Sequence, residues 1–228
     1  MVDGKLSMYS IILSRRDFRE NDQIISLYTK EKGKQEVLAR GVKKITSKNS
    51  AHLEPFSFVD VEIVPGKEID HLTKVQPINY FSDIRKDLQK SLSAGYVVNL
   101  TDKLVHGGEV DERIFELLKT WLEFVDQCNP IKSIPPLAGI PSKGGMESML
   151  DGFVVKFLVL LGFDILSSDL RSAEIKKDLD ILSLGSWELI NNLQFEGDEA
   201  KRVHKKIYNY LIFQTERRVE DWAKISQI

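Results

Sequence analysis

The sequence predicts an α+β protein in two parts, a small closed β-barrel followed by an α-helical domain. From Ser7 to about Gln76 apolar and polar residues alternate within short segments, which is the pattern of half-buried strands. After Pro77 the apolar residues recur three and four positions apart, which is the pattern of amphipathic helices. We therefore expect a barrel domain over residues 1–80 and a helical domain over residues 81–228.

Five strands are expected in the first part, because five apolar segments are separated by turn-forming or polar residues. They cover residues 8–14, 22–29, 35–40, 56–64 and 69–75. Gly33-Lys34 and Pro65-Gly66 are typical turn sequences between strands. A sheet of this size exposes both of its edges unless it closes on itself, so a barrel is the expected arrangement.

The second part is expected to be a bundle of helices. The predicted helices cover residues 82–104, 112–125, 146–161, 173–183, 186–193 and 198–225. In the first helix the apolar face is predicted to comprise Ile84, Leu88, Leu92, Tyr96, Leu100 and Leu104. Asp111 is a candidate cap for the second, whose buried side is predicted to comprise Ile114, Phe115, Leu118, Trp121, Leu122 and Val125. Helix 146–161 is apolar all round, which indicates a central position, with Gly162 ending it.

Residues 129–145 contain four of the seven prolines and three glycines, so we expect a linker or an ordered loop inside the helical domain. The Ser-Lys-Gly-Gly at its end lacks the spacing of a phosphate-binding loop.

No catalytic pattern is found. A single cysteine, Cys128, excludes an internal disulfide and a thiolate cluster, and the four histidines are scattered. Neighbouring carboxylates such as Asp178 and Asp180 are better explained as solvated helix faces. We therefore expect a protein that is not an enzyme and that uses no cofactor and no metal. No apolar run is long enough to span a membrane, and the first residues do not resemble a signal peptide, so the cytosol is the expected location.

Positive charge is concentrated near the N-terminus. Residues 1–50 carry eleven Lys/Arg and six Asp/Glu, a balance of +5, so the net charge of −2 leaves −7 for the rest. Residues 30–48 alone contain seven basic and two acidic side chains. Such an excess on turns and loops beside strands favours a polyanionic partner, although a solvated surface or an acidic protein partner remains an alternative.

The residues predicted to contact this polyanionic partner fall into three groups. The first choice is Lys34, Arg40, Lys43 and Lys44, followed by Arg15, Arg16 and Arg19, and then by Lys30, Lys32 and Lys48. Among the interleaved aromatic residues, Phe18 lies in a polar connection and is the best candidate for stacking on bases. Phe56 and Phe58 are expected to point into the barrel, because acidic Asp60 and Glu62 follow them.

Several of these segments together resemble one family. Residues 13–22 (Leu-Ser-Arg-Arg-Asp-Phe-Arg-Glu-Asn-Asp), 29–34, 39–44 and 53–56 are similar to the start of RecO, the bacterial recombination mediator. The resemblance covers about the first 80 residues and weakens across the helical part.

This resemblance implies an OB-fold barrel that binds single- and double-stranded DNA, followed by a helical domain. It also implies that the protein anneals complementary strands and, with RecR, helps to load RecA onto DNA coated by single-strand-binding protein (SSB). The implied location is the bacterial cytoplasm, at the nucleoid. Many members carry a four-cysteine zinc module after the Leu-Gly-Phe element, but residues 164–184 contain no cysteine here, so a member without zinc is expected.

Family members also bind the acidic C-terminal tail of SSB. In this chain Arg217 and Arg218, predicted on the last amphipathic helix, are the candidate cations for that tail. Two rival functions stay open from the residues: a protein-interaction scaffold whose barrel docks an acidic partner, and a nuclease.

Overall fold

A computed structural model gives the fold. It describes residues 6–45, 47, 49–128, 142–143, 145–165, 175–195 and 198–227. The contacts divide the chain into two compact units, which we describe separately. The first comprises residues 1–83 and 94–122, and the second comprises residues 84–93 and 123–228. Helices α2 and α3 each contribute residues to both units.

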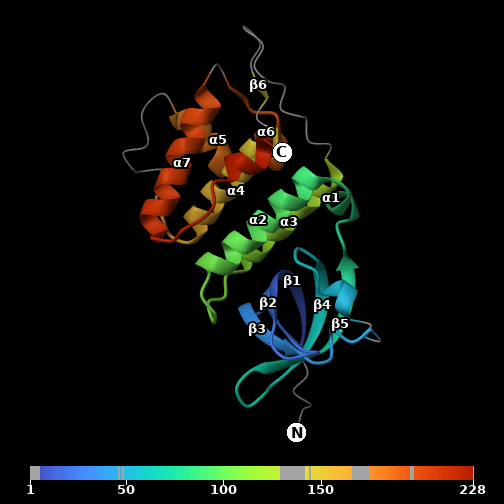
Figure 1. The fold of residues 1–228 in the computed structure, drawn as a ribbon. Coiled ribbons are helices and arrows are strands. Elements are labelled where there is room, and N and C mark those ends of the chain that lie inside the picture. The colour runs from blue at the N-terminus through green and yellow to red at the C-terminus, as the bar shows by residue number, and fades with distance from the viewer. Residues whose placement is uncertain are drawn as a thin grey trace. The chain divides into compact units, whose positions relative to one another are not determined.

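Five strands of the first unit form a closed barrel (Figure 1). They are β1 (Leu6–Asp17), β2 (Gln23–Thr29), β3 (Gly33–Ala39), β4 (Phe58–Val64) and β5 (Asp70–Asn79), with the short 3-10 helix η1 (Ser50–His52) between β3 and β4. The order around the barrel is β1-β2-β3-β5-β4, and every pairing is antiparallel except that of β3 with β5. The predicted five-stranded barrel is confirmed, and its Greek-key order is that of an OB-fold.

The register of β4 corrects one expectation. Val59, Val61 and Ile63 are buried in the barrel core, so the residues between them face outward. Phe58 is two positions from outward-facing Asp60 and therefore points away from the barrel interior. The expectation that it points inward was wrong, because residues two apart in a strand share a face. Phe58 is nevertheless buried, since its ring lies 6.0 Å from that of Phe115 on α3.

The predicted helix over residues 82–104 is interrupted. The structure has α1 (Ser82–Lys86) and α2 (Leu88–Leu104), and between them the Asp87 carboxylate accepts a hydrogen bond from the Lys90 N–H at 2.9 Å. Asp87 thus caps α2. Leu88 and Leu92 are exposed, contrary to prediction. A strict spacing of four residues drifts around a helix of 3.6 residues per turn, so these six residues cannot all share one face.

Helix α3 (Glu112–Gln127) follows the prediction closely. The Asp111 carboxylate accepts a hydrogen bond from the Arg113 N–H at 2.9 Å, which confirms the cap. All six residues predicted on the buried side are buried. In this helix the apolar residues alternate at spacings of three and four, which keeps them on one face.

The second unit is built around α4. Its elements are β6 (Ser142–Lys143), α4 (Gly145–Leu160), α5 (Lys176–Leu184), α6 (Trp187–Asn191), β7 (Gln194–Phe195), α7 (Glu199–Thr215) and η2 (Trp222–Gln227). Helix α4 contacts α5, α6, α7 and η2, so its predicted central position is confirmed. Gly162 has a φ of +86° and ends the helix as predicted. Among the described residues, no helix is both long enough and apolar enough to cross a membrane.

Two predictions in this unit were wrong. Ser142 and Lys143, in the segment expected to be irregular, form a two-residue strand paired with β7, while residues 129–141 lie outside the described residues. The last helix ends at Thr215 and not at residue 225, and Glu216 follows in a left-handed conformation. The chain then turns back, so that the Tyr208 hydroxyl donates a hydrogen bond to the Val219 carbonyl at 3.1 Å. A straight helix would not allow this contact.

A buried polar cluster holds the returning segment. The His204 ring donates from Nδ1 to Asp151 on α4 and from Nε2 to Asp221, both at 2.9 Å. The Trp222 indole N–H donates to the same Asp151 oxygen at 2.8 Å. Burial alone lowers the pKa of His204, but the hydrogen bond and charge of Asp151, the hydrogen bond of Asp221 and the charge of Glu147 outweigh it and raise the pKa to about 9. The imidazole is therefore positively charged and links α4, α7 and the segment before η2.

This charge makes stability dependent on pH. The ordinary pKa of 6.5 applies to the unfolded chain, so the contribution of His204 is fully present below pH 6.5 and is lost as pH rises through about 9. We expect a loss of about 1–3 kcal/mol across this window, because burial of Asp151 offsets part of the attraction. Urea unfolding followed by tryptophan fluorescence at several pH values measures it.

The control variants are His204→Gln and His106→Gln, the latter at an exposed position of the α2–α3 connection. His204→Gln is expected to be less stable at pH 6.5 and to lack this loss, whereas His106→Gln is expected to follow the wild type. Parallel profiles for His204→Gln and the wild type would contradict the assignment.

Candidate nucleic-acid interface

The structure separates the basic residues 30–48 into two groups. Strands β2 and β3 form a hairpin in which Thr29 pairs with Gly33 at one end and Gln23 pairs with Ala39 at the other. The predicted cations before and after β3 therefore lie at opposite ends of a seven-residue strand, roughly 20 Å apart at about 3.3 Å per residue. We call residues 30–34 the turn end, and residues 18–22 with 40–45 the loop end.

At the turn end, Lys34 is bound inside the first unit. Its ammonium group lies 2.9 Å from the Asp102 carboxylate of α2 and donates to the backbone carbonyls of Asp102 and Val105. Only 17% of the Lys34 side chain is exposed. Lys34, the first choice for a DNA contact, thus has a partner within the protein.

The Asp102 carboxylate is bound by side chains from three strands of the barrel. Besides Lys34 on β3, it accepts hydrogen bonds from the hydroxyls of Ser14 on β1 at 2.7 Å and Ser26 on β2 at 2.6 Å. Burial by itself raises the pKa of Asp102, but the bonds from Ser26, Ser14 and Lys34 outweigh it and hold the pKa below its ordinary value. The carboxylate is therefore ionised, and both of its oxygens accept hydrogen bonds.

Lys30, a second cation of the turn end, forms ion pairs with helix α3. The Lys30 ammonium group lies 2.9 Å from Glu112 and 3.6 Å from Glu116, and the hydrogen bond to Glu112 raises the pKa of Lys30. Gly33 has a φ of +65°, and a Cβ there would lie 2.0 Å from the backbone oxygen of Glu109. Only glycine fits at this position, because the β2–β3 turn packs directly on the α2–α3 connection.

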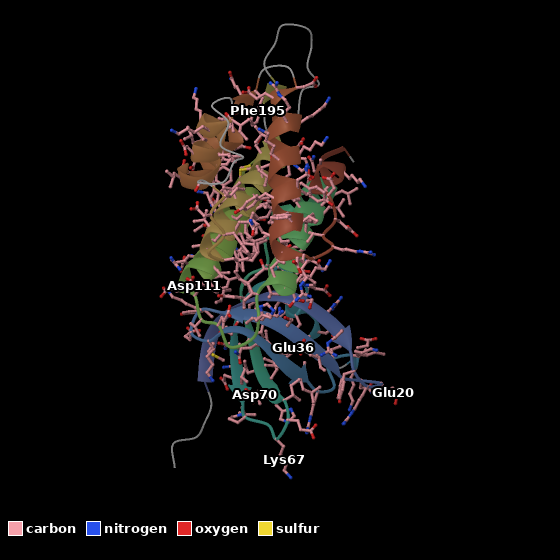
Figure 2. The ribbon with its side chains drawn as sticks, turned by 90° about the vertical axis from the view of Figure 1, so that its left-hand side faces the viewer. Glu20, Glu36, Lys67, Asp70, Asp111 and Phe195 are labelled. Atoms are coloured by element: carbon pink, nitrogen blue, oxygen red, sulfur yellow. The ribbon has the colours of Figure 1, made fainter. Side chains whose placement is uncertain are left out.

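The loop end is differently constructed. The Gly41 N–H donates to Asp22 Oδ1 at 2.8 Å, and the Lys43 N–H donates to the Asn21 carbonyl at 3.1 Å. These bonds join the loop after β3 to the turn between β1 and β2. Between them is a surface depression of about 440 Å³, lined by Arg19, Glu20, Asn21, Asp22, Arg40, Gly41 and Lys44. Figure 2 shows Glu20, in this turn, and Asp111, at the start of α3, on opposite sides of the first unit.

Three of the predicted cations line the depression, and their side chains are exposed. Arg19 lies over the Phe18 ring, 5.1 Å from its centroid, and Phe18 is 46% exposed as the sequence suggested. Arg40 is exposed and places one guanidinium nitrogen 3.4 Å from His71 Nε2. Lys44 is exposed, and none of the described residues forms an ion pair with it.

The remaining predicted cations are paired or less open. Lys43 forms a 2.7 Å ion pair with Asp17, whose pKa the Lys43 and Gln23 hydrogen bonds lower. On β1, Arg15 pairs with Glu54 at 2.7 Å and Arg16 with Glu36 at 3.3 Å. Lys32 is half-buried at the turn end, and Lys48 lies outside the described residues. Arg217 and Arg218 are exposed beyond the end of α7, so their predicted placement on a helix was wrong.

Sequence reasoning missed the two carboxylates that organise these ends. Asp22 is close in sequence to the predicted arginines, but its partner is 19 residues away. Asp102 is 68 residues from Lys34 and lies in a helix whose charged residues resemble an ordinary solvated face. Neither has a local signal that identifies its role.

Comparison with known proteins supports the resemblance. Residues 5–81 match the family described as "Recombination protein O N terminal". Relatives named DNA repair protein RecO include that of Desulforamulus reducens, 31% identical over 166 residues, which are 73% of this chain and 57% of the relative. The protein of Geobacter metallireducens is 35% identical over 124 residues, 54% of this chain and 51% of the relative. The chain thus matches about half the length of these relatives.

The contacts of Lys34 and Lys44 predict different losses of stability on substitution by glutamate. Lys34→Glu places a second carboxylate beside Asp102 in a largely buried position, so we expect a loss of about 2–4 kcal/mol in the free energy of unfolding. Lys44→Glu changes an exposed side chain and is expected to stay within about 0.5 kcal/mol of the wild type. Urea unfolding measures both, and equal stabilities would contradict the proposed role of the Lys34–Asp102 pair.

Proposed function

Because the chain belongs to the RecO family of DNA repair proteins, we propose that it binds single- and double-stranded DNA at the loop end of its barrel. The observation that carries this proposal is the gathering of Arg19, Arg40 and Lys44 around one depression, next to exposed Phe18. At the turn end, Lys30 and Lys34 already have carboxylate partners. The loop end is therefore the better site for phosphates.

The mechanism we propose is one of binding alone. Lysine and arginine at the loop end contact DNA phosphates and release condensed counterions. Lowering the charge of each strand reduces repulsion between two strands, so complementary bases can pair, while an exposed ring such as Phe18 can stack on an unpaired base. No bond is made or broken, so the proposal includes no catalytic residue and no cofactor.

The finer steps follow from the family and are also proposals. We propose that the protein anneals complementary strands and, together with RecR, helps RecA to load onto single-stranded DNA coated by SSB. The site of action would be the bacterial nucleoid. These steps need a surface for DNA and a separate surface for the SSB tail, and the two compact units can supply one each.

A groove between α5 and α6 is our candidate for the acidic SSB tail. It has a volume of about 620 Å³ and is lined by Lys176, Lys177, Asp180, Ile181, Leu184, Gly185 and Leu189. Leu184 and Leu189 are exposed and can cover an aromatic side chain, while the two lysines can pair with carboxylates. The Lys156 ammonium group donates to the carbonyls of Ser183 at 2.7 Å and Gly185 at 2.9 Å, which fixes the end of α5.

The DNA site is tested by Arg40→Glu/Lys44→Glu. We expect the affinity for fluorescently labelled single-stranded DNA, measured by anisotropy, to fall about tenfold or more, with a salt slope smaller by about 1.4 for two lost phosphate contacts. The matched control is Lys103→Glu/Lys205→Glu, which makes the same charge change at exposed helical positions. If wild type does not bind DNA, or if both double variants bind equally well, the loop end is not the DNA site. An acidic protein partner would then be the better explanation of its charge.

The tail site is tested with a synthetic peptide that has acidic residues and a C-terminal aromatic residue. Lys176→Glu/Lys177→Glu is expected to weaken binding about tenfold, because like charges then face the peptide carboxylates. Arg217→Glu/Arg218→Glu carries the same charge change beyond α7 and is expected to change binding less than about twofold. The reverse result would place the tail beside Arg217 and Arg218, as the sequence suggested.

A further inference from the structure

Two carboxylates, Glu20 and Asp22, stand among the cations of the loop end. Both line the depression that also contains Arg19, Arg40 and Lys44. A carboxylate at a phosphate-binding surface repels the ligand, so each of them should weaken binding if charge were its only effect. Their contacts, however, differ. Glu20 is exposed and forms no hydrogen bond or ion pair with the described residues, whereas Asp22 is half-buried and hydrogen-bonded.

Asp22 organises the turn between β1 and β2 through its backbone. Its carbonyl accepts hydrogen bonds from the N–H groups of Phe18 at 3.2 Å and Arg19 at 3.5 Å. Its own N–H donates to the Arg19 carbonyl at 3.4 Å. The positions of the stacking candidate and of one cation are therefore fixed relative to the Asp22 backbone.

The side chain of Asp22 also binds the loop after β3, which carries Arg40 and Lys44. Its Oδ1 accepts the Gly41 N–H at 2.8 Å, at the residue where the loop leaves β3 with a φ of +62°. The Lys44 N–H in turn donates to the Gly41 carbonyl at 3.1 Å, and neighbouring Val42 is only 2% exposed. The contact thus fixes the backbone from which Arg40 and Lys44 project.

We propose that Asp22 is a positioning residue for DNA binding, which holds the loop of Arg40 and Lys44 against the turn of Arg19. The inference rests on the proposed DNA-binding function and deepens it. A phosphate is bound most tightly when several cations converge on it, and their convergence here depends on the hydrogen bond between Asp22 and Gly41. Loss of this bond leaves the bond from the Lys43 N–H to the Asn21 carbonyl as a remaining backbone contact between the two segments, so their spacing is held less firmly. The gain from removing one negative charge does not compensate for that.

The negative charge of Asp22 weakens DNA binding, whereas its hydrogen bond to Gly41 strengthens it, so variants can separate the two effects. Asp22→Ala removes the charge and the acceptor, and we expect the affinity for labelled single-stranded DNA to fall about threefold to tenfold, with a smaller salt slope. Asp22→Asn keeps an acceptor oxygen while removing the charge, and is expected to bind at least as tightly as the wild type. The matched control Glu20→Ala, which removes only a charge, is also expected to bind as tightly or more tightly.

A second measurement reports on the contact directly. In hydrogen exchange followed by NMR, the Gly41 amide should exchange slowly in the wild type and in Asp22→Asn, and faster in Asp22→Ala. Should Asp22→Ala not fold, Asp22→Ser takes its place, because its shorter side chain cannot bring an oxygen to Gly41 at the same distance. A role limited to stability would lower the unfolding free energy without changing the salt slope of the folded protein.

The outcomes separate this inference from the function on which it rests. If wild type binds DNA through Arg40 and Lys44, but Asp22→Ala binds as tightly as Glu20→Ala, the positioning role is wrong and the proposed function stands. If wild type does not bind DNA, both are overturned. Weaker binding by Asp22→Ala together with retained binding by Asp22→Asn supports the inference.

Discussion

The arrangement of the first unit depends on the hydrogen bonds and the ion pair that the Asp102 carboxylate forms. It accepts hydrogen bonds from Ser14 and Ser26 and an ion pair from Lys34, and so joins three neighbouring strands to the end of helix α2. A partly buried charge is unfavourable unless it is hydrogen-bonded and paired, and here three donors, one of them the Lys34 ammonium group, surround it. Because the partners come from β1, β2 and β3, the contact can form only when the barrel has its correct register.

This contact also determines which cations are available to a ligand. Phosphates must compete with Asp102 for Lys34 and with Glu112 for Lys30. Among the described residues, Lys44 forms no ion pair at the loop end, and the Arg40 guanidinium group contacts His71 but pairs with no carboxylate. A ligand that binds there displaces water and counterions but no carboxylate, which is why the proposed interface is smaller than the basic stretch of the sequence suggests.

Sequence patterns that span only a few residues predicted several elements of the fold correctly. The five strands, the cap at Asp111 and the termination at Gly162 all follow from patterns within a few residues. Predictions failed for two reasons. The orientation of Phe58 and the four-residue spacing of residues 82–104 were local patterns that we misinterpreted. The end of α7 depends on a distant contact, because the chain turns back and the Tyr208 hydroxyl bonds to the Val219 carbonyl. For the site, residue types were predictable, but their partners were not.

The same reasoning applies to the second unit, whose sixteen Lys/Arg and seventeen Asp/Glu give it a net charge of only −1. Two of its carboxylates, Asp151 and Asp221, are bound to the charged ring of His204 and do not act as free surface charges. In the groove between α5 and α6, in contrast, Lys176 and Lys177 are exposed. Net charge counts every ionisable group equally, whereas a ligand meets only the groups that internal pairing leaves open. A nearly neutral chain can therefore offer one cationic surface on each unit, and each can serve a different anionic partner.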